Sequence, residues 1–317
     1  MKASLGAAAL LWLPALAGAQ AGITVQQKTS FNVARITSAD LNQTVSILGA
    51  DRARTVTTGK VKVLIISRDA GGTEITRLDQ DQVIKLDDKK KKFEIKSLAE
   101  LRADLLKQQQ DAARAAPEAQ EDKDMRYYVV VDEARRTGER KPINGFDTEQ
   151  VLIRITVMGE NTRTKQTAPH MYLVTDTWVD RSQREATRIS TAYQEARTRA
   201  LGMDPAMAAN PYSKWLQEVD AEMVKVEGYP ILTRISFELP VDSTAAAPPA
   251  EEKPSPEANP LSRGLGGLLG RKAKPEEPAP KGSGRPVLFT STVEVLSIST
   301  TPPPSGDFEI PAGYTKK

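Results

Sequence analysis

Residues 151–158, Val-Leu-Ile-Arg-Ile-Thr-Val-Met, show the clearest alternation of apolar and polar side chains in this chain. In an extended segment the four apolar residues at odd positions point to one side, whereas Arg154 and Thr156 point to the other. A strand with one dry and one solvated face is typical of an antiparallel sheet that is covered on one side. This stretch therefore predicts a sheet-based fold, and the rest of the chain is interpreted outward from it.

Other segments with alternating or β-branched residues predict further short strands. Turns are indicated by Thr58-Gly59, by residues 69–72 (Asp-Ala-Gly-Gly) and by Asn144-Gly145, because glycine accepts the positive φ of tight turns. Consecutive strands joined by such turns form antiparallel sheets. The predicted strands are residues 60–66, 73–78, 82–86, 92–96, 126–132, 171–180, 231–239 and 286–300.

Helices are predicted at three places. Ser97 and Glu100 have the spacing of a capping box, so a helix should begin there. A second helix is expected over residues 183–201, whose apolar residues follow a helical stripe. A third should open at Asn210, with Pro211 at its first helical position, and end before residue 228, a glycine.

Two segments lack the composition of packed structure. Residues 108–124 are polar and read as a mobile loop, and residues 241–285, rich in Pro, Ala, Glu and Lys, read as a disordered insertion. Neither can bury enough apolar surface to offset the entropy lost on ordering. Because a strand is expected after the insertion, residues 20–240 and 286–317 are predicted to form a single domain.

Residues 1–19 are typical of a cleavable signal peptide. A positive charge at Lys2 precedes an apolar core, and small residues follow at the expected cleavage position between Ala19 and Gln20. The apolar run is shorter than the roughly 20 residues that span a bilayer. A lipoprotein would need cysteine in place of Gln20, so the mature protein is expected to be soluble and periplasmic, without a transmembrane anchor.

The composition argues against several classes of function. The 44 basic and 41 acidic residues are intermixed, which does not favour nucleic-acid binding, and the absence of cysteine excludes disulfides and thiol chemistry. His170 is the only histidine, so a zinc site or a Ser-His-Asp triad is not expected. The acidic pair Asp79 and Asp81 does not continue as a calcium loop. We expect a non-enzymatic protein without metal or cofactor.

Four stretches, taken in order, carry a resemblance to a known family. They are residues 75–97 (ITRLDQDQVIKLDDKKKKFEIKS), 137–155 (TGERKPINGFDTEQVLIRI), 175–179 (TDTWV) and 308–317 (FEIPAGYTKK). They resemble a bacterial exported domain family of unknown function, related to the LolA-type outer-membrane lipoprotein carriers and lipoprotein-sorting proteins. The similarity covers most of residues 23–240 and 286–317.

The resemblance implies an α+β fold. It would be a curved antiparallel sheet, an incomplete barrel, covered on one face by about three helices, and in the carriers the concave cavity receives acyl chains. The expected function is therefore the binding of a lipid, an acyl chain or another hydrophobic molecule on the concave face. The candidate lining residues are Val61, Val63, Ile65, Val151, Ile153, Ile155, Val157, Ile235 and Phe237.

Two alternatives stay open at this point. The same apolar side chains could simply fill a core, because buried strands need apolar faces whether or not a ligand exists. The protein could instead be an interaction module in which residues 108–124 and 241–285 recruit another envelope protein.

Overall fold

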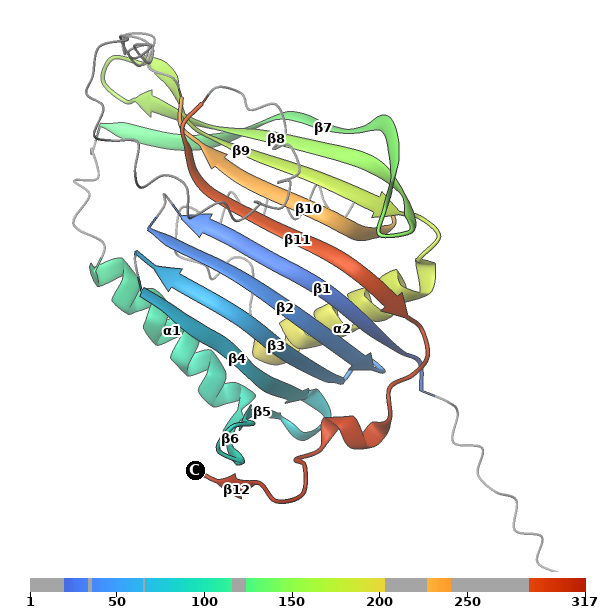
Figure 1. Ribbon diagram of the computed structural model, residues 1–317. Coiled ribbons are helices and arrows are strands. Elements are labelled where there is room, and N and C mark those ends of the chain that lie inside the picture. Colours follow the sequence, from blue (N-terminus) through green and yellow to red (C-terminus); the bar gives the residue numbers. More distant parts are fainter. Residues whose placement is uncertain (1–19, 34–35, 65, 116–123, 203–226, 241–284) are drawn as a thin grey trace, which may run out of the picture.

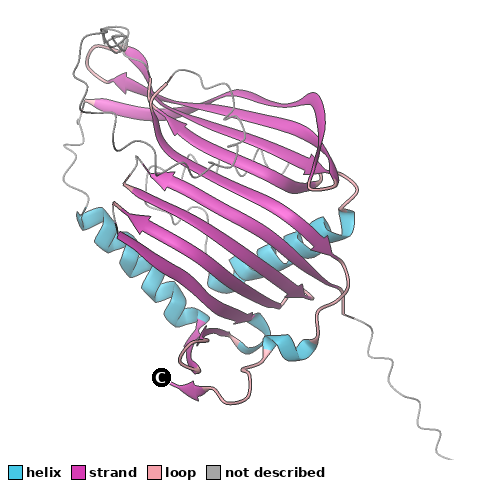
Figure 2. Ribbon diagram, in the orientation of Figure 1, coloured by secondary structure: helices cyan, strands magenta, loops and turns pink. Residues whose placement is uncertain are grey.

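The structure is a computed structural model that describes residues 20–33, 36–64, 66–115, 124–202, 227–240 and 285–317. Its dominant feature is one antiparallel sheet with two helices behind it (Figures 1 and 2). The predicted signal peptide, the helix expected from Asn210 and the insertion expected at 241–285, apart from residue 285, lie outside the described residues.

The described chain forms a single 12-stranded sheet in the order β12-β6-β5-β4-β3-β2-β1-β11-β10-β9-β8-β7. All neighbours are antiparallel except β12 and β6. The strands are β1 (Gly22–Val33), β2 (Thr37–Leu48), β3 (Arg52–Val63), β4 (Ile66–Arg77), β5 (Gln82–Asp87), β6 (Lys92–Ser97), β7 (Met125–Ile143), β8 (Phe146–Asn161), β9 (Thr167–Asp180), β10 (Tyr229–Glu238), β11 (Val287–Ser299) and β12 (Thr315–Lys316). The helices are α1 (Leu98–Ala115) and α2 (Arg184–Leu201), with 3₁₀ turns η1 (Leu78–Gln80) and η3 (Ser305–Phe308).

The predicted fold class is wrong. Instead of an α+β barrel-like sheet under about three helices, the described residues form an open, mainly β structure with two α-helices. The physical reason lies in residues 22–77, which form four strands of 12 residues each. Many of their side chains are Thr, Ser, Gln or Lys, so the apolar alternation that predicts long strands is weak. The four strands nevertheless pair continuously through their backbones.

Two glycine-containing segments of this region that predict turns lie within strands instead. Thr58-Gly59 lies inside β3, and residues 69–72 lie inside β4; the chain reverses instead at Leu64, which has φ of 53°. Gly59 has φ of 152°, and a Cβ there would lie 2.1 Å from the carbonyl oxygen of Asp40. The glycine is therefore required by close approach of β2 to β3 and not by a turn.

Helix α1 begins as the capping box predicts. The Ser97 hydroxyl accepts a hydrogen bond from the Glu100 amide at 3.1 Å, and the Ser97 amide donates to the Glu100 carboxylate at 2.7 Å. The bonds that the Ser97 amide and the Ser97 hydroxyl donate to the carboxylate lower the pKa of Glu100, because they stabilise its ionised form. The helix continues through Ala115, into residues that were expected to be a loop. Neither described helix is long and apolar enough to cross a membrane.

Helix α2 defines two faces of the sheet. Ala186, Ile189 and Tyr193 on the helix pack against residues of β1, β2, β3, β10 and β11, including Ile23 and Ile47. Burial of its side chain between α2 and the sheet raises the pKa of Tyr193, because burial disfavours the ionised form. We call the side that carries α2 the inner face, and the opposite side the outer face.

The C-terminal segment covers part of the outer face. Phe308, at the end of η3, is fully buried in a cluster with Leu48, Ile75, Ile84 and Leu86. Beyond it, the Thr315 amide donates to the Lys91 carbonyl at 3.0 Å, and the chain adds to the sheet edge as β12. The closing FEIPAGY motif is therefore a structural element that seals one end of the sheet.

A buried arginine joins this segment to the sheet. Arg77, at the end of β4, is 5% exposed and forms ion pairs with Asp79 at 2.8 Å and with Glu309 at 2.5 Å. Its guanidinium also donates to the carbonyl of Phe308. The bond to Asp79 raises the pKa of Arg77 and lowers that of Asp79. This network fixes η3 over the outer-face cluster.

Candidate ligand-binding face

Most of the predicted ligand-binding residues come together on the inner face of β8 and β10. They form two adjoining clusters with Leu173 and Met171 of β9, and the four residues of β8 are at most 3% exposed. We call this region the apolar wall. Its predicted members are Val151, Ile153, Ile155, Val157, Ile235 and Phe237.

The remaining candidates do not join the apolar wall. Val61 and Val63 lie on β3, in the other half of the sheet, and belong to neither cluster. Val63 is 48% exposed at the end of its strand. Ile65 lies outside the described residues. The eight described candidates therefore mark two regions of the inner face, which the sequence pattern alone could not separate.

Sequence reasoning missed the part of the apolar wall that lies on β9. Leu173 and Val179 are buried there, at 2% and 1% exposure, and face the same side as Ile153. The period-two pattern of residues 171–179 contains this information, because Met171, Leu173 and Val179 share one parity. Threonines interrupt the pattern at positions 175 and 177, which hid its apolar character.

These two threonines are the chemically unusual feature of the apolar wall. Thr175 pairs with Ile153 on one side and with Ile235 on the other, and Thr177 pairs with Val151 and Thr233. Their exposed fractions are 2% and 0%. Among the residues that the structure describes, neither side-chain hydroxyl has a hydrogen-bond partner. Buried hydroxyls are normally satisfied, so each of these requires an explanation.

The apolar wall continues toward an open end of the sheet. The Phe237 ring contacts Phe289 of β11 edge-on, with 5.5 Å between ring centroids. Phe289 pairs in turn with Val33 at the end of β1, where exposure rises to 38%. The inner face is thus apolar from the buried wall to the hairpin that joins β1 and β2.

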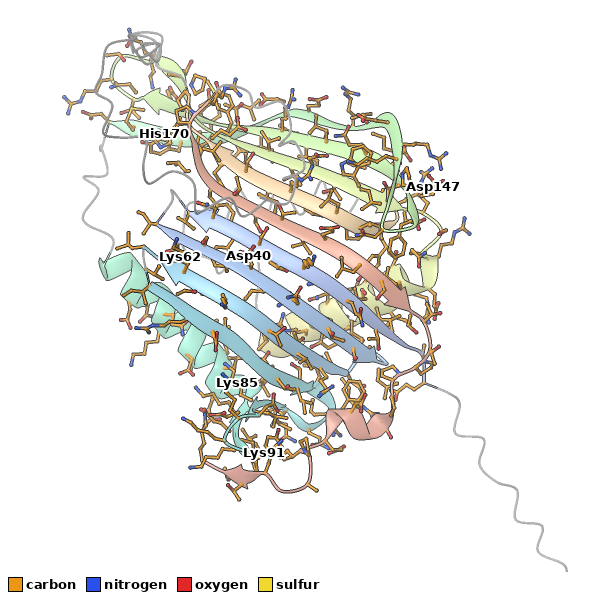
Figure 3. The ribbon with its side chains drawn as sticks, in the orientation of Figure 1. Asp40, Lys62, Lys85, Lys91, Asp147 and His170 are labelled. Carbon is orange, nitrogen blue, oxygen red and sulfur yellow. The ribbon has the colours of Figure 1, made fainter. Side chains whose placement is uncertain are left out.

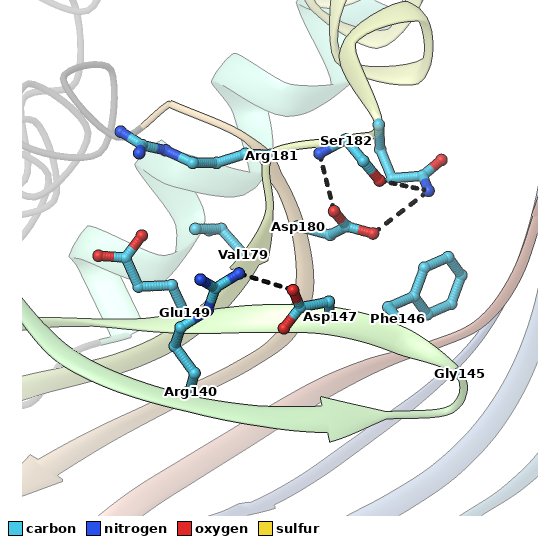
Figure 4. A pocket seen from close by; sticks show the side chains of 10 residues that line it. Arg140, Gly145, Phe146, Asp147, Glu149, Val179, Asp180, Arg181 and Ser182 are labelled. Atoms are coloured by element: carbon cyan, nitrogen blue, oxygen red, sulfur yellow. Dashed lines mark hydrogen bonds and ion pairs between the residues drawn. The ribbon is translucent and has the colours of Figure 1, made fainter.

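A separate pocket lies at the other end of β8, beside the β7–β8 turn (Figure 4). Its volume is about 460 Å³, and its lining includes Phe146, Asp180 and the guanidinium of Arg140. The turn is the predicted Asn144-Gly145 pair, which the structure confirms with φ values of 50° and 85°. The side-chain amide of Asn144 anchors the turn by donating to the Val295 carbonyl at 2.8 Å.

The charged side chains around this pocket form ion pairs and hydrogen bonds with other residues of the protein. Arg140 pairs with Asp147 at 2.6 Å, and Asp180 accepts bonds from the Ser182 amide and the Gln183 side chain (Figure 4). An adjoining pocket of about 520 Å³ is lined by Arg181, Arg184, Arg188 and Glu227, among others. There too, Arg181 pairs with Glu227, and Arg188 with Glu185. Three of the four charged residues that line this second pocket are thus paired within the protein.

His170 lies far from these pockets, at the opposite end of the β8–β9 hairpin. The side chain is exposed, and its ring contacts that of Tyr127 with 4.7 Å between centroids. Within the part of the chain that the structure describes, no group of three His, Cys, Asp or Glu residues could hold a metal ion.

Comparisons with known proteins give a loose structural similarity. No protein-family profile matches the chain, and no curated protein matches it either. Among solved structures, the chain is similar to an outer membrane lipoprotein-sorting protein domain from Vibrio parahaemolyticus, at 8% sequence identity and a TM-score of 0.24. The match covers 91% of this chain and 89% of that one. A superposition this loose identifies neither the fold nor the family.

Proposed function

We propose that this is a non-enzymatic, periplasmic binding protein that holds an amphipathic lipid or acyl chain against the apolar wall. The observation that carries the proposal is the pair of buried, unpaired hydroxyls of Thr175 and Thr177 in the middle of that wall. Apolar strand residues are explained equally well by a filled core. Buried hydroxyls without partners are not, because each costs about 1–3 kcal/mol in proteins.

The ligand chemistry follows from this arrangement. The apolar side chains of β8 and β10 contact a hydrocarbon chain, and the hydroxyls meet a polar group, such as an ester or carboxyl oxygen, that accepts their hydrogen bonds. The six candidate residues on β8 and β10 contribute apolar surface. Val61 and Val63 lie apart from the buried wall and contribute nothing to this contact.

The binding experiment uses the full chain, purified under native conditions after export. Native mass spectrometry should detect co-purified lipid, and a fluorescent fatty acid should bind to delipidated protein. The variant Ile235→Gln places an amide in the apolar wall and should weaken binding of the fluorescent fatty acid about tenfold or more, since 1.4 kcal/mol corresponds to a factor of ten.

The matched control is Ser236→Gln, one residue along β10 on the outer face. It should bind the fatty acid within about twofold of the unmodified protein, because its side chain does not face the apolar wall. If no lipid co-purifies and neither protein binds the probe, the apolar wall is a filled core and the proposal is wrong.

Thr175→Val tests the hydroxyl directly. Valine keeps the shape of threonine, so removal of the unpaired hydroxyl should stabilise the ligand-free protein by about 1 kcal/mol in urea unfolding. The same variant should bind the fatty acid more weakly, since the hydrogen bond to its polar group is lost.

Thr148→Val provides the contrasting variant. The hydroxyl of Thr148 is equally buried but donates to the Lys141 carbonyl at 2.6 Å, so its removal should destabilise the protein by about 1 kcal/mol. If both valine variants were destabilised alike, the hydroxyl of Thr175 would have a partner within the protein, and its use by a ligand would be excluded.

A further inference from the structure

Exposed aliphatic side chains gather where two hairpins end side by side. The β1–β2 hairpin contributes Val33 and Ile36, and the β3–β4 hairpin contributes Val63, Leu64 and Ile66. Their exposed fractions are 38%, 52%, 48%, 63% and 57%, respectively. We call these five residues the hairpin-tip patch. It lies at the left end of β1–β4 in Figure 1.

The two tips form one surface. The Ile36 amide donates to the Val33 carbonyl at 2.7 Å, and the Leu64 amide donates to the Ile36 carbonyl at 2.6 Å, so one hairpin end is bonded to the other. In the register of the sheet, Val33, Thr37, Val63 and Ile66 form one row across four strands. Single exposed apolar residues are ordinary on protein surfaces, but a contiguous group marks an interaction site.

Charges behind the patch follow a defined order. The second row from the tips contains Lys62 between Ser38 and Ser67, and the third contains Arg68 opposite Val61. Acidic residues first appear in the fourth row, where Asp40 and Asp69 flank Lys60. Figure 3 shows Lys62 nearer to the hairpin ends than Asp40. At about 3.3 Å per residue, the first acidic groups on β1–β4 lie roughly 10 Å behind the aliphatic row.

This order matches the layers of an anionic membrane surface. Aliphatic side chains at the tips reach the boundary between headgroups and acyl chains, while basic side chains a few ångströms behind them reach the phosphates. Acidic side chains remain outside the headgroup layer. A protein partner could also bind the exposed aliphatic side chains. It would not, however, require the basic residues to lie closer to the hairpin tips than the acidic residues do.

We infer that the hairpin-tip patch docks the protein on bilayers that contain anionic phospholipid. Because Val33 also lies at the open end of the apolar inner face, docking places that end against the membrane. The inference rests on the exposed residues and their charges alone, so it stands whether or not the apolar wall binds a ligand.

The test measures co-flotation of the full chain with vesicles of phosphatidylcholine containing about 30% phosphatidylglycerol. The double variant Ile36→Ser/Leu64→Ser should reduce the bound fraction at least tenfold, because two aliphatic anchors are lost. The double variant Lys62→Gln/Arg68→Gln should also weaken binding at least tenfold, given about 1 kcal/mol for each basic residue near an anionic surface. Vesicles of pure phosphatidylcholine, and high salt, should reduce binding of the unmodified protein.

The matched control is Leu106→Ser/Val130→Ser, which removes two aliphatic residues of 37% and 39% exposure from elsewhere on the surface. It should bind the anionic vesicles like the unmodified protein. Docking is refuted if the unmodified protein does not float with anionic vesicles, or if both serine variants behave alike. Concentration-dependent dimerisation that Ile36→Ser/Leu64→Ser abolishes, without vesicle binding, would instead assign the patch to contacts between copies of the chain. The fatty-acid assay contains no vesicles, so the two proposals fail independently.

Discussion

Replacement of Phe308 by alanine is expected to destabilise the protein by about 3–5 kcal/mol, a large share of the stability of an ordinary domain. The phenyl ring is fully buried on the outer face, where it contacts side chains from β2, β4 and β5. Its removal leaves a cavity that the rigid strands around it cannot collapse to fill. Equilibrium unfolding in urea measures the change.

The comparison variant for Phe308→Ala is Val130→Ala on β7, where 39% of the residue is exposed. Its effect should stay below about 1 kcal/mol, because little apolar surface is lost. Equal destabilisation by the two variants would mean that the C-terminal segment does not pack on the sheet in solution.

Arg77→Met is expected to have the second-largest effect, a loss of about 3 kcal/mol. The methionine fills much of the same volume, but Asp79 and the carbonyl of Phe308 lose their donor. Removal of one partner from a buried ion pair is costly because the other charge remains incompletely solvated. Arg188→Met, at the solvent-exposed pair with Glu185 on α2, should cause no measurable change.

Arg77→Met should also change how the free energy of unfolding depends on pH in the acid range. The bond from Arg77 holds the pKa of Asp79 below its ordinary value of 3.8. The stabilisation that the Arg77–Asp79 pair gives the folded state is therefore complete well above pH 3.8. It is lost as the pH falls through the lower pKa that Asp79 has in the folded state. The difference in unfolding free energy between the unmodified protein and Arg77→Met should be constant above about pH 5 and shrink below pH 3.8. A difference that does not change with pH would exclude Asp79 as the coupled group.

Local signals were the most accurate part of the sequence analysis. The helix start at Ser97 and the turn at Asn144-Gly145 were both predicted correctly, because each depends on hydrogen bonds or dihedral angles of a few consecutive residues. The alternation of residues 151–158 likewise identified a strand with one buried face. Interactions within one short segment can be predicted from the sequence without knowledge of the fold.

Features that depend on neighbouring strands were not predictable in this way. Gly59 is needed because the backbone of β2 passes close to it, and no local pattern distinguishes that requirement from a turn. Thr175 and Thr177 look like ordinary strand residues until their neighbours on β8 and β10 are known. The hairpin-tip patch was not predictable either, because the β3–β4 turn at Leu64 lies within residues 60–66, which the pattern predicts as one continuous strand.

The position of β11 has a consequence for the order in which the chain can fold. This strand lies between β1 and β10, so it joins two groups of strands that are formed by much earlier residues. A chain that emerges from its N-terminus exposes the unpaired edges of β1 and β10 until residues 287–299 arrive. Completion of the sheet therefore waits for nearly the whole polypeptide, which makes folding slow and late. During that interval the unpaired strand edges can pair with those of other chains, so the incomplete sheet needs protection from aggregation.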